Sequence, residues 1–455
     1  MQSTAEILAP VTSASSTYTR IIPAEKHPIT ENMLSPDALH VMRKLNKEGF
    51  SAYLVGGGVR DLYLGKQPKD FDISTDARPG QIRKLFPNSK TIGRRFRLVQ
   101  VFCRNGNVIE ISTLRSLSEH DLDGPEAVLA PNNTFGSLDE DAQRRDLTIN
   151  SLFYEIKTNT IIDHVNGVRD LDQSIIRIVG NPDKRINRDP VRMMRAIRHA
   201  ARNGFAIEEN SWNTICASHD KLLLCPPSRL RDETLKDIYS GAAAAWFDLA
   251  ASSGIFADLF KVYKGRLQSR ITDETTCQQQ LAGIFSTVDR INSVAVNNRI
   301  SRQPDYFMLA LILVPWAELK YSLYSQQLKG SALFQVSKRI RSDIDSELGV
   351  QLNLRRSLRQ DIAALLTNLS SLIHHRQNNS WPKWLRKKSY FQRSALFYHC
   401  YIEAIGGEQV DESHFDIVHN THTPPIISEH EPSKDVRNKP AFAPRSKKGI
   451  FGFKK

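Results

Sequence analysis

The sequence predicts an α+β protein in which a small α/β domain is followed by an all-α body. In the first part, up to about Gly180, short apolar runs typical of strands alternate with helical segments and glycine turns. The pair Asp189-Pro190 then joins a good helix cap to a residue favoured in a first helical turn. From there to about Gly406 the pattern is helical almost throughout, without an internal repeat.

The bulk composition favours a polyanionic partner. The chain of 455 residues has 62 Lys and Arg against 49 Asp and Glu, a formal net charge of +13. Such a charge says nothing about the fold, but it favours binding to nucleic acid or to an anionic membrane surface. No run of about 18 apolar residues occurs, so no membrane span is expected, and the longest candidate, 307–316, is predicted to be a buried helix. The five cysteines are scattered without a CxxC pair, which indicates reduced thiols and a cytoplasmic protein.

The α/β part is predicted to alternate helices with short strands, because its apolar runs are separated by Gly, Pro and Asn turns. Its first helix is amphipathic, with Leu39, Met42 and Leu45 at helical spacing. In chain order we expect helices over 37–48, 59–64 and 79–86, strands over 52–55 and 70–74, and an antiparallel pair over 91–103 and 108–114.

Composition divides the chain further. The first residues are rich in Ser and Thr and poor in acids, which is typical of a flexible extension. The last segment is Pro-rich and polar and ends in clusters of Lys and Arg, which is typical of a disordered basic tail. We therefore predict an N-terminal extension (1–33), an α/β head (34–180), a helical neck (181–265), a helical body (266–407) and a disordered basic tail (408–455).

A glycine-rich turn is predicted between the first strand and the next helix, in Leu54-Val55-Gly56-Gly57-Gly58-Val59-Arg60-Asp61. Glycines at such a turn let the backbone approach a phosphate closely and direct N–H groups and a helix N-terminus toward it. Arg60, in the first turn of that helix, is a candidate for a bidentate phosphate contact. A glycine run taken alone is more often only a turn.

The next strand carries a pair of carboxylates, Asp70 and Asp72. Residues two apart on a strand point to one face, so the two side chains are expected to meet. Two like charges at such a distance are costly unless a cation lies between them, and Mg²⁺ prefers a few carboxylates together with substrate phosphates. The alternative is a solvated strand end, because the pattern DxD alone is common.

The glycine turn and the carboxylate pair together place phosphate contacts beside metal ligands. The block from 53 to 74 resembles the signature of the class II nucleotidyltransferase superfamily, which contains bacterial poly(A) polymerases and tRNA CCA-adding enzymes. The resemblance implies a polymerase-β-like head, followed by a helical neck and body that bind nucleotide and RNA. It also implies catalysis with two Mg²⁺ ions, held by Asp70 and Asp72, and contacts to the triphosphate of ATP from Gly56, Gly57 and Arg60.

A third motif, Arg144-Arg145-Asp146-Leu147-Thr148-Ile149-Asn150, resembles the family's RRDFTIN box. The resemblance implies that Arg145, Asp146 and Asn150 hold the nucleotide. Asp146 is our candidate for a third catalytic carboxylate, and its rival is Glu110, on the strand predicted over 108–114. Without the family, the Arg-Asp pair would be an ion pair of little consequence at a helix end.

A fourth motif, Arg188-Asp189-Pro190-Val191-Arg192-Met193-Met194-Arg195-Ala196, resembles the family's EDPxRMLRA box. In that box acid and Arg side chains read the Watson–Crick edge of the incoming base, which implies that Asp189 and Arg192 bind the nucleotide. Arg188 stands where the family has Glu, and this departure leaves the details of base selection open. Without the family, the motif is an Asp-Pro helix cap followed by a solvated basic face.

The segment Gly93-Arg94-Arg95-Phe96 favours one branch of the family, because it resembles the signature of the poly(A) polymerases. It implies an enzyme that adds AMP from ATP to the 3′ ends of mRNA and other single-stranded RNA without a template, releases pyrophosphate, and acts in RNA polyadenylation and turnover. One alternative is CCA addition to tRNA. A second is a catalytically inactive RNA-binding relative, against which the intact Asp70 and Asp72 argue.

Overall fold

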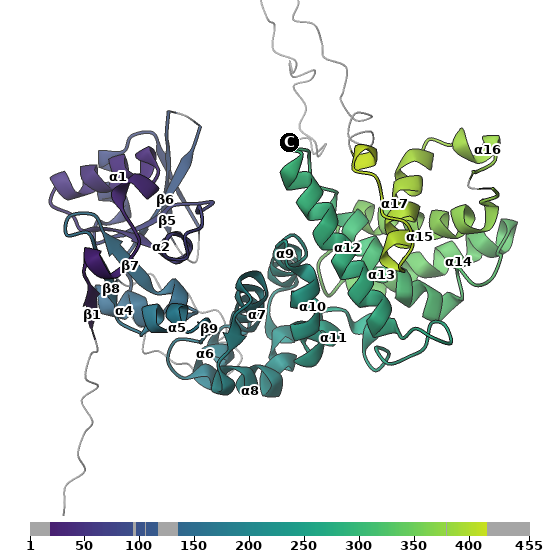
Figure 1. Cartoon of the computed structure of the whole chain (residues 1–455), viewed down its shortest axis with the longest axis horizontal. Helices are drawn as coiled ribbons and strands as arrows, with labels where there is room; N and C mark the ends of the chain where they lie inside the picture. The colour runs from purple at the N-terminus through teal and green to yellow at the C-terminus, as the bar shows by residue number, and fades with distance from the viewer. Residues whose placement is uncertain (1–18, 94–96, 105, 117–134, 379, 416–455) are drawn as a thin grey trace, which may run out of the picture.

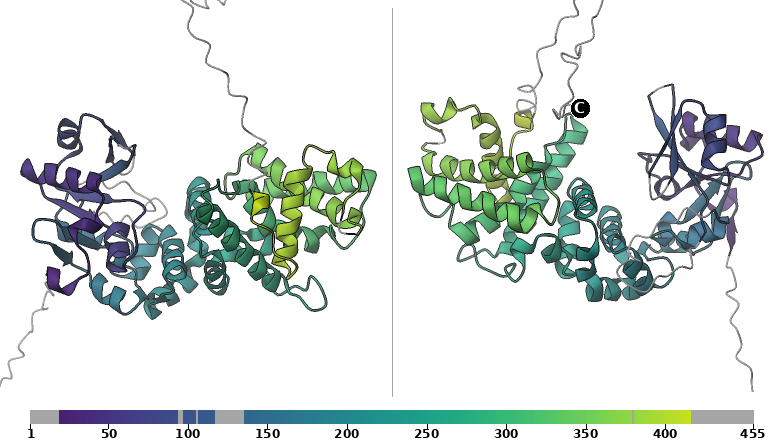
Figure 2. Two further views of the ribbon diagram at one scale, coloured as in Figure 1. Left: turned by 45° about the horizontal axis from the view of Figure 1, so that its top comes forward. Right: turned by 180° about the vertical axis from the view of Figure 1, so that it is seen from behind.

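A computed structural model describes residues 19–415 of the chain, with gaps at 94–96, 105, 117–134 and 379. The head, the helical neck and the helical body follow one another along an arc, with the head at one end and the body at the other (Figures 1 and 2). The predicted α+β class, a mixed sheet followed by an all-α region, is confirmed. Within the described ranges no helix is both long enough and apolar enough to cross a membrane.

The described part of the head is built on one eight-stranded sheet in the order β1-β8-β7-β2-β3-β6-β5-β4. All neighbouring strands are antiparallel except β3 and β6, which run parallel. The strands are β1 (Arg20–Ile22), β2 (Ala52–Val55), β3 (Asp72–Thr75), β4 (Ser89–Ile92), β5 (Leu98–Phe102), β6 (Val108–Thr113), β7 (Leu152–Glu155) and β8 (Thr160–Asp163).

Side chains of β2 alternate between the two faces of this sheet, as the period of a strand requires. Leu54 contributes to the main core with α1 (Pro36–Lys47), α2 (Gly57–Tyr63), α3 (Pro79–Leu85) and α5 (Gly167–Asp172). Val55 and Phe153 form a smaller core on the opposite face with Ala142 of α4 (Leu138–Gln143). The sheet is therefore buried on both faces around the end of β2, where the glycine turn begins.

The neck and body are helical apart from a two-stranded parallel ribbon of β9 (Ile175–Ile176) and β10 (Ala206–Ile207). Helix α13 is buried along Phe307–Ala317, which confirms the predicted buried helix. The neck contains α6 (Pro182–Arg188), α7 (Val191–Asn203), α8 (Glu209–Ser218), α9 (Pro227–Ile238), α10 (Ala243–Ser252) and α11 (Ile255–Leu259). The body contains α12 (Cys277–Asn297), α13 (Asp305–Tyr321), α14 (Gly330–Asp343), α15 (Arg356–His375), α16 (Lys383–Arg386) and α17 (Phe391–Ala404).

Two predicted boundaries are wrong. Residues 19–33 are not a flexible extension, because β1 pairs with β8 at the edge of the sheet and Ile22 and Ile29 are buried in the main core. Residues 408–415 are not part of a disordered tail, because Val410 and Phe415 are buried and Arg290 lies over the Phe415 ring. The rest of the predicted extension (1–18) and of the predicted tail (416–455) lies outside the described residues.

Two predicted strands also differ from the structure. β3 begins at Asp72 rather than Asp70, which lies just before the strand. The long strand predicted over 91–103 is two strands, β4 and β5, which pair with each other on either side of Gly93, whose φ is +86°. A positive φ suits Gly because it has no Cβ, so the chain reverses there. The predicted antiparallel pairing with 108–114 is confirmed by β5 and β6.

Substitution of Gly283 tests the packing of the body. A Cβ on Gly283 in α12 would lie 2.1 Å from the Ala404 carbonyl oxygen at the end of α17. Gly283→Ala should therefore destabilise the protein by about 1–3 kcal/mol, the usual cost of overpacking. The matched control is Gly80→Ala in α3, where a Cβ would meet nothing within 4 Å, and it should be neutral or slightly stabilising. Thermal midpoints by circular dichroism measure both, and equal midpoints for the two variants would contradict the close approach of α12 and α17.

Candidate active site

The pairing of three strands brings the glycine turn and two carboxylates together. In the antiparallel register of β2 and β3, Val55 lies opposite Asp72. Gly56 follows directly, with a φ of +66° that a side chain would strain, and α2 begins at Gly57. β6 runs parallel to β3 with Ile111 beside Ile73, so Glu110 enters at the same end of the sheet as Asp72.

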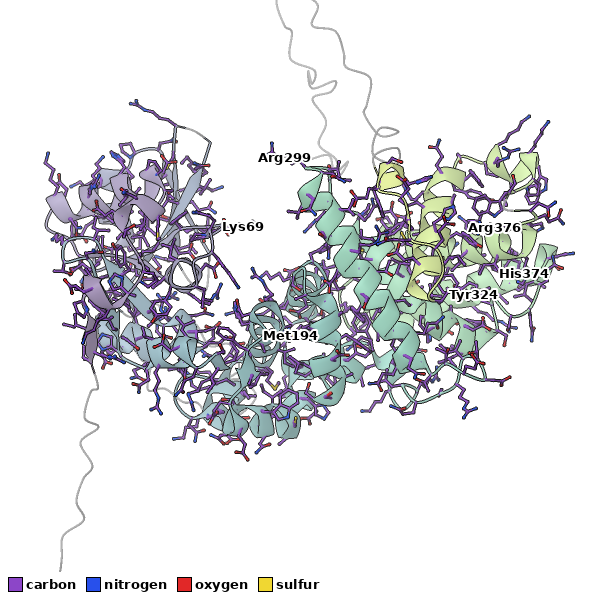
Figure 3. All side chains as sticks on the ribbon, viewed as in Figure 1. Lys69, Met194, Arg299, Tyr324, His374 and Arg376 are labelled. Carbon is purple, nitrogen blue, oxygen red and sulfur yellow. The ribbon has the colours of Figure 1, made fainter. Side chains whose placement is uncertain are left out.

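A cavity of about 490 Å³ lies at this end of the sheet, between the head and the neck. Most of the predicted site residues line it: Gly56, Gly57, Arg60, Asp72, Arg145, Asp146, Asn150, Asp189 and Arg192. Asp70 does not line the cavity. Its neighbour Lys69 lies on the side of the head that faces the neck and body (Figure 3).

The carboxylate pair is in fact accompanied by a third acid, Glu110. Burial, together with the negative charges of Glu110 and Asp70, raises the pKa of Asp72 to about 6. Glu110 is held from the side by Gln100, whose Nε2 donates a 2.9 Å hydrogen bond to Glu110 Oε1. A bound cation would relieve the repulsion between these carboxylates, which contributes to the raised pKa of Asp72.

The donor set fits Mg²⁺ in part. In the described residues no group of three or more His, Cys, Asp or Glu side chains is arranged to hold a metal ion by itself. Mg²⁺, however, is usually bound through one or two carboxylates together with substrate phosphates and waters, rather than in a cage made of protein alone. Carboxylate oxygens beside the glycine turn therefore suit Mg²⁺ better than zinc or another metal that prefers nitrogen and sulfur ligands.

Asp146 lies in the same cavity but faces the neck. Its Oδ2 accepts a hydrogen bond from Arg195 Nη1 at 3.2 Å, and its Oδ1 accepts one from the Leu147 backbone N–H at 2.9 Å. Burial would raise the pKa of Asp146, but the charges of Arg195 and Arg192 outweigh it and hold the pKa well below its usual range. The geometry therefore places Glu110, not Asp146, beside Asp72, contrary to the preference from the sequence.

Arg60 is engaged inside the protein. Its Nε and Nη2 donate to Asp61 Oδ1 at 2.9 and 2.7 Å, and its Nη1 donates to Asn150 Oδ1 at 2.6 Å. The side chain is only 4% exposed. Arg60 thus orients Asn150 and also lines the cavity, so its predicted contact with phosphate stays a prediction.

Arg145 and Arg192 join the head to the neck. Arg145 pairs with buried Asp141 through Nε and Nη2, at 3.2 and 2.9 Å, and donates to Ser74 Oγ at 3.2 Å. Arg192, on α7, donates from Nη1 to the Arg145 carbonyl at 2.7 Å and from Nη2 to the Arg144 carbonyl at 3.2 Å. These bonds hold the third motif against the fourth.

Three polar atoms on the neck side of the cavity are buried without a hydrogen-bond partner in the described residues. Asp189 Oδ2 accepts a hydrogen bond from Arg229 Nη2 at 2.8 Å. Asp189 Oδ1, Arg192 Nε and Arg229 Nη1 are buried, and within the described part of the chain they have no hydrogen-bond partner. Buried polar atoms without partners are costly. The Asp189 acceptor and the Arg192 and Arg229 donors are therefore suited to hydrogen bonds with polar atoms of a ligand.

Sequence reasoning missed several residues that line the cavity. Arg195 follows Arg192 by three residues on α7 and is part of the fourth motif, but it was not named as a site residue. His199 follows Arg195 by four residues, so helical periodicity could have found it. Arg229 comes from α9 and had no local signal. The cavity wall carries seven arginines against four carboxylates: Arg60, Arg115, Arg144, Arg145, Arg192, Arg195 and Arg229 against Asp72, Glu110, Asp146 and Asp189. This excess of positive charge suits a polyphosphate.

Comparison with known proteins agrees with this geometry. Residues 52–177 match the poly A polymerase head domain, and residues 204–265 match the probable RNA and SrmB-binding site of polymerase A. The class of protein that the fold and the site define is therefore a nucleotidyltransferase. Over its head and neck the chain is similar to the bacterial poly(A) polymerases of the class II nucleotidyltransferase family.

Individual relatives come from both branches of this family. Poly(A) polymerase I of Escherichia coli O6:H1 is 44% identical over 247 residues, which are 53% of this chain and 53% of that protein. The CCA-adding enzyme of Lactobacillus helveticus is 40% identical over 200 residues, 44% of this chain and 49% of that protein. The chain thus matches these relatives over about half of their length. A solved CCA-adding enzyme in its apo form II has the same fold, with a TM-score of 0.50 and 19% identity over 86% of this chain and 97% of that one.

The buried His199 should make stability depend on pH. Burial and the Arg60 guanidinium lower the pKa of His199 to about 3 in the folded protein, from 6.5 in a model peptide. Between these two values the unfolded chain binds a proton that the folded chain does not, so stability falls as the pH is lowered. In the wild type, His199 should lower the free energy of unfolding by up to about 2 kcal/mol when the pH falls from about 7 to about 5. His199→Gln should not show this part of the loss. Denaturant midpoints of both proteins at the two pH values test this. An equal change of midpoint with pH in the wild type and in the variant would refute it.

Proposed function

We propose that the chain adds AMP units from ATP to the 3′ end of RNA without a template, and releases pyrophosphate. The observation that carries the proposal is the strand register that places the glycine turn beside Asp72 and Glu110, in a cavity with an excess of arginine. The similarity to poly(A) polymerase I supports the choice of ATP and RNA. A cytoplasmic location, expected from the scattered cysteines, belongs to the same proposal.

In the proposed reaction the RNA 3′ oxygen forms a bond to the α-phosphorus of ATP, and the bond from that phosphorus to the bridging oxygen of pyrophosphate breaks. Asp70 and Asp72, with Glu110 beside them, would hold Mg²⁺, which when bound activates the attacking oxygen and stabilises the leaving one. The backbone at Gly56 and Gly57 approaches the phosphates, and the arginines of the cavity neutralise their charge. The contribution of this chain is mainly positioning and electrostatic stabilisation.

The neck atoms without partners support a role in base selection. Asp189 Oδ1 can accept from the amino group of a base, and Arg192 Nε can donate to a neighbouring ring nitrogen. Adenine presents such an amino donor, but cytosine does as well. The pair therefore supports binding of ATP without excluding CTP, and CCA addition to tRNA stays as the second candidate function, favoured by the similarity to CCA-adding enzymes.

Two sequence features bear on this choice without deciding it. Arg188, in place of the family's Glu, lies at the end of α6 immediately before Asp189. In the signature Gly93-Arg94-Arg95-Phe96, residues 94–96 lie outside the described residues, so the role of these side chains stays a prediction.

The geometry predicts which acid assists the metal ligands. Glu110→Gln should lower kcat by about tenfold or more, because Glu110 lies beside Asp72, and Asp72→Asn should lower it further. Asp146→Asn should instead raise the KM for ATP and lower the thermal midpoint, because it removes one of the two carboxylate charges that pair with Arg195. Steady-state kinetics with an RNA primer separate the two effects. A Glu110→Gln enzyme with normal kcat would remove Glu110 from the site.

Nucleotide use separates the two candidate functions. We expect long tails on an oligo(A) primer with ATP, and little incorporation with CTP. The measurement is a gel-resolved extension with each nucleotide separately, on oligo(A) and on a tRNA lacking its 3′ end. Addition of two C and one A to the tRNA, without growth on oligo(A), would overturn the poly(A) polymerase proposal in favour of CCA addition. No incorporation on either primer would favour the inactive RNA-binding relative.

A further inference from the structure

A basic segment lies at the end of the body that is farthest from the head. Between Asp361 and Glu403 the sequence contains no acidic residue, and it carries six cations: Arg376, Lys383, Arg386, Lys387, Lys388 and Arg393. The segment runs from α15 through α16 to α17, at the opposite end of the arc from the sheet (Figure 1). Lys383 and residues 386–390 are exposed. So many cations without compensating acids favour a polyanion.

Aromatic side chains stand among these cations. Trp384 and Tyr390 are 52% and 39% exposed, whereas most Phe, Tyr and Trp rings of the body are buried or half-buried. Trp381 is different, because its Nε1 donates to the Leu372 carbonyl at 2.9 Å and its ring packs against Phe391. Trp381 therefore anchors the loop, and Trp384 and Tyr390 are left at the surface.

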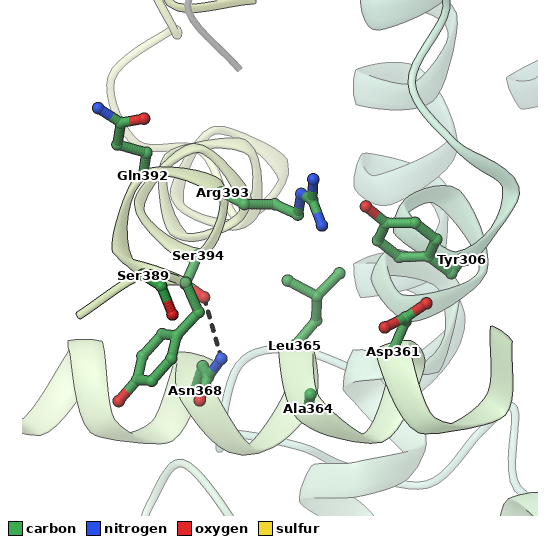
Figure 4. Close-up of a pocket in the computed structure, with 10 residues that line it drawn as sticks. Tyr306, Asp361, Ala364, Leu365, Asn368, Ser389, Gln392, Arg393 and Ser394 are labelled. Carbon is green, nitrogen blue, oxygen red and sulfur yellow. Dashed lines mark hydrogen bonds between the residues drawn. The ribbon is translucent and has the colours of Figure 1, made fainter. Parts of the chain in front are cut away.

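A cavity of about 400 Å³ opens beside Tyr390, within the usual size range of ligand pockets. Its floor is apolar at Ala364 and Leu365 of α15. Its walls are polar: Arg393 lies over the Tyr306 ring, 5.5 Å from the centroid, and Asn368 Nδ2 donates to Ser394 Oγ at 3.1 Å (Figure 4). Asp361 adds one carboxylate to the lining. An apolar floor with amide, hydroxyl, guanidinium and carboxylate groups around it suits the donors and acceptors of a nucleobase.

We propose that residues 383–393, together with this cavity, form a second contact site for single-stranded RNA, which binds the part of the primer upstream of its 3′ end. Tyr390 stacks on a base at the mouth of the cavity, Trp384 stacks on a neighbouring base, and Lys387 and Lys388 contact the phosphates. The site lies outside residues 204–265, which match the RNA-binding family segment. This proposal rests on the proposed function for the identification of the ligand as RNA. It does not require the chain to be catalytically active.

The test measures binding of labelled oligo(A) primers of increasing length to the full chain, without ATP or metal. Tyr390→Ala should raise the Kd of long primers roughly fivefold or more, the expected loss for one stacked base. Tyr390→Phe, which keeps the ring, should bind like the wild type. Replacing both Lys387 and Lys388 by Gln should lower the slope of log Kd against log salt by about 0.7 for each lost phosphate contact. Short primers, which cannot span the arc from the head, should show none of these changes.

The matched control is Phe334→Ala combined with Lys338→Gln on α14: Phe334 is 67% exposed and has a cation on the same helix, but neither residue lines the cavity beside Tyr390. This variant should bind primers of every length like the wild type. An unchanged Kd for Tyr390→Ala, or an equal loss in the α14 control, would overturn the proposal and leave the basic segment to another polyanionic partner. Single-turnover AMP addition to a short primer reports on the proposed function separately, since it should remain normal in the Tyr390 variants.

Discussion

The hydrogen-bonded register of β2, β3 and β6 is the constraint on which the site depends. Antiparallel pairing places the end of β2, at Val55, opposite Asp72, and the parallel strand β6 brings Glu110 to the same end of the sheet. The turn at Gly56 then lies beside both carboxylates. A shift of one residue in this register would move Asp72 to the other face of the sheet, so backbone hydrogen bonds decide the chemistry as much as the side chains do.

Buried charges fix the neck against the head. Arg192 donates to two carbonyls of the head, and Arg195 pairs with Asp146. Behind them, Glu233 of α9 pairs with both Arg195 and Arg198. Because an unpaired buried charge is far more costly than a paired one, these contacts favour one arrangement of head and neck. The two walls of the cavity are thereby held at a defined separation, as positioning of a substrate requires.

Two clusters of positive charge occur in the part of the chain that the structure describes. One set of arginines lines the cavity between head and neck, where acids accompany them and the geometry is rigid. The other set follows Asp361 in the sequence, with no acid before Glu403, and four of its cations are exposed: Lys383, Arg386, Lys387 and Lys388. The first arrangement suits a compact, highly charged ligand such as a triphosphate. The second suits a flexible polyanion that is held along its length. The proposed nucleotide site therefore depends on closely placed charges, and the proposed second RNA site depends on charges spread along the chain.

The sequence by itself determined the fold class, the glycine turn and the carboxylate motif, because helical and strand periods and turn residues are local properties. Other residues that line the cavity, such as Asn150 and Asp189, were expected only because their motifs resemble those of the class II nucleotidyltransferases. Only the tertiary structure decided which acid lies beside Asp72. The sequence favoured Asp146 over Glu110, but the position of each acid depends on which strand pairs with β3 and on where α7 places Arg195. The addition of β1 to the sheet and the hydrogen bond from Arg60 to Asn150 were unpredictable for the same reason. Each of them is a contact between distant parts of the chain, which no local pattern of residues encodes.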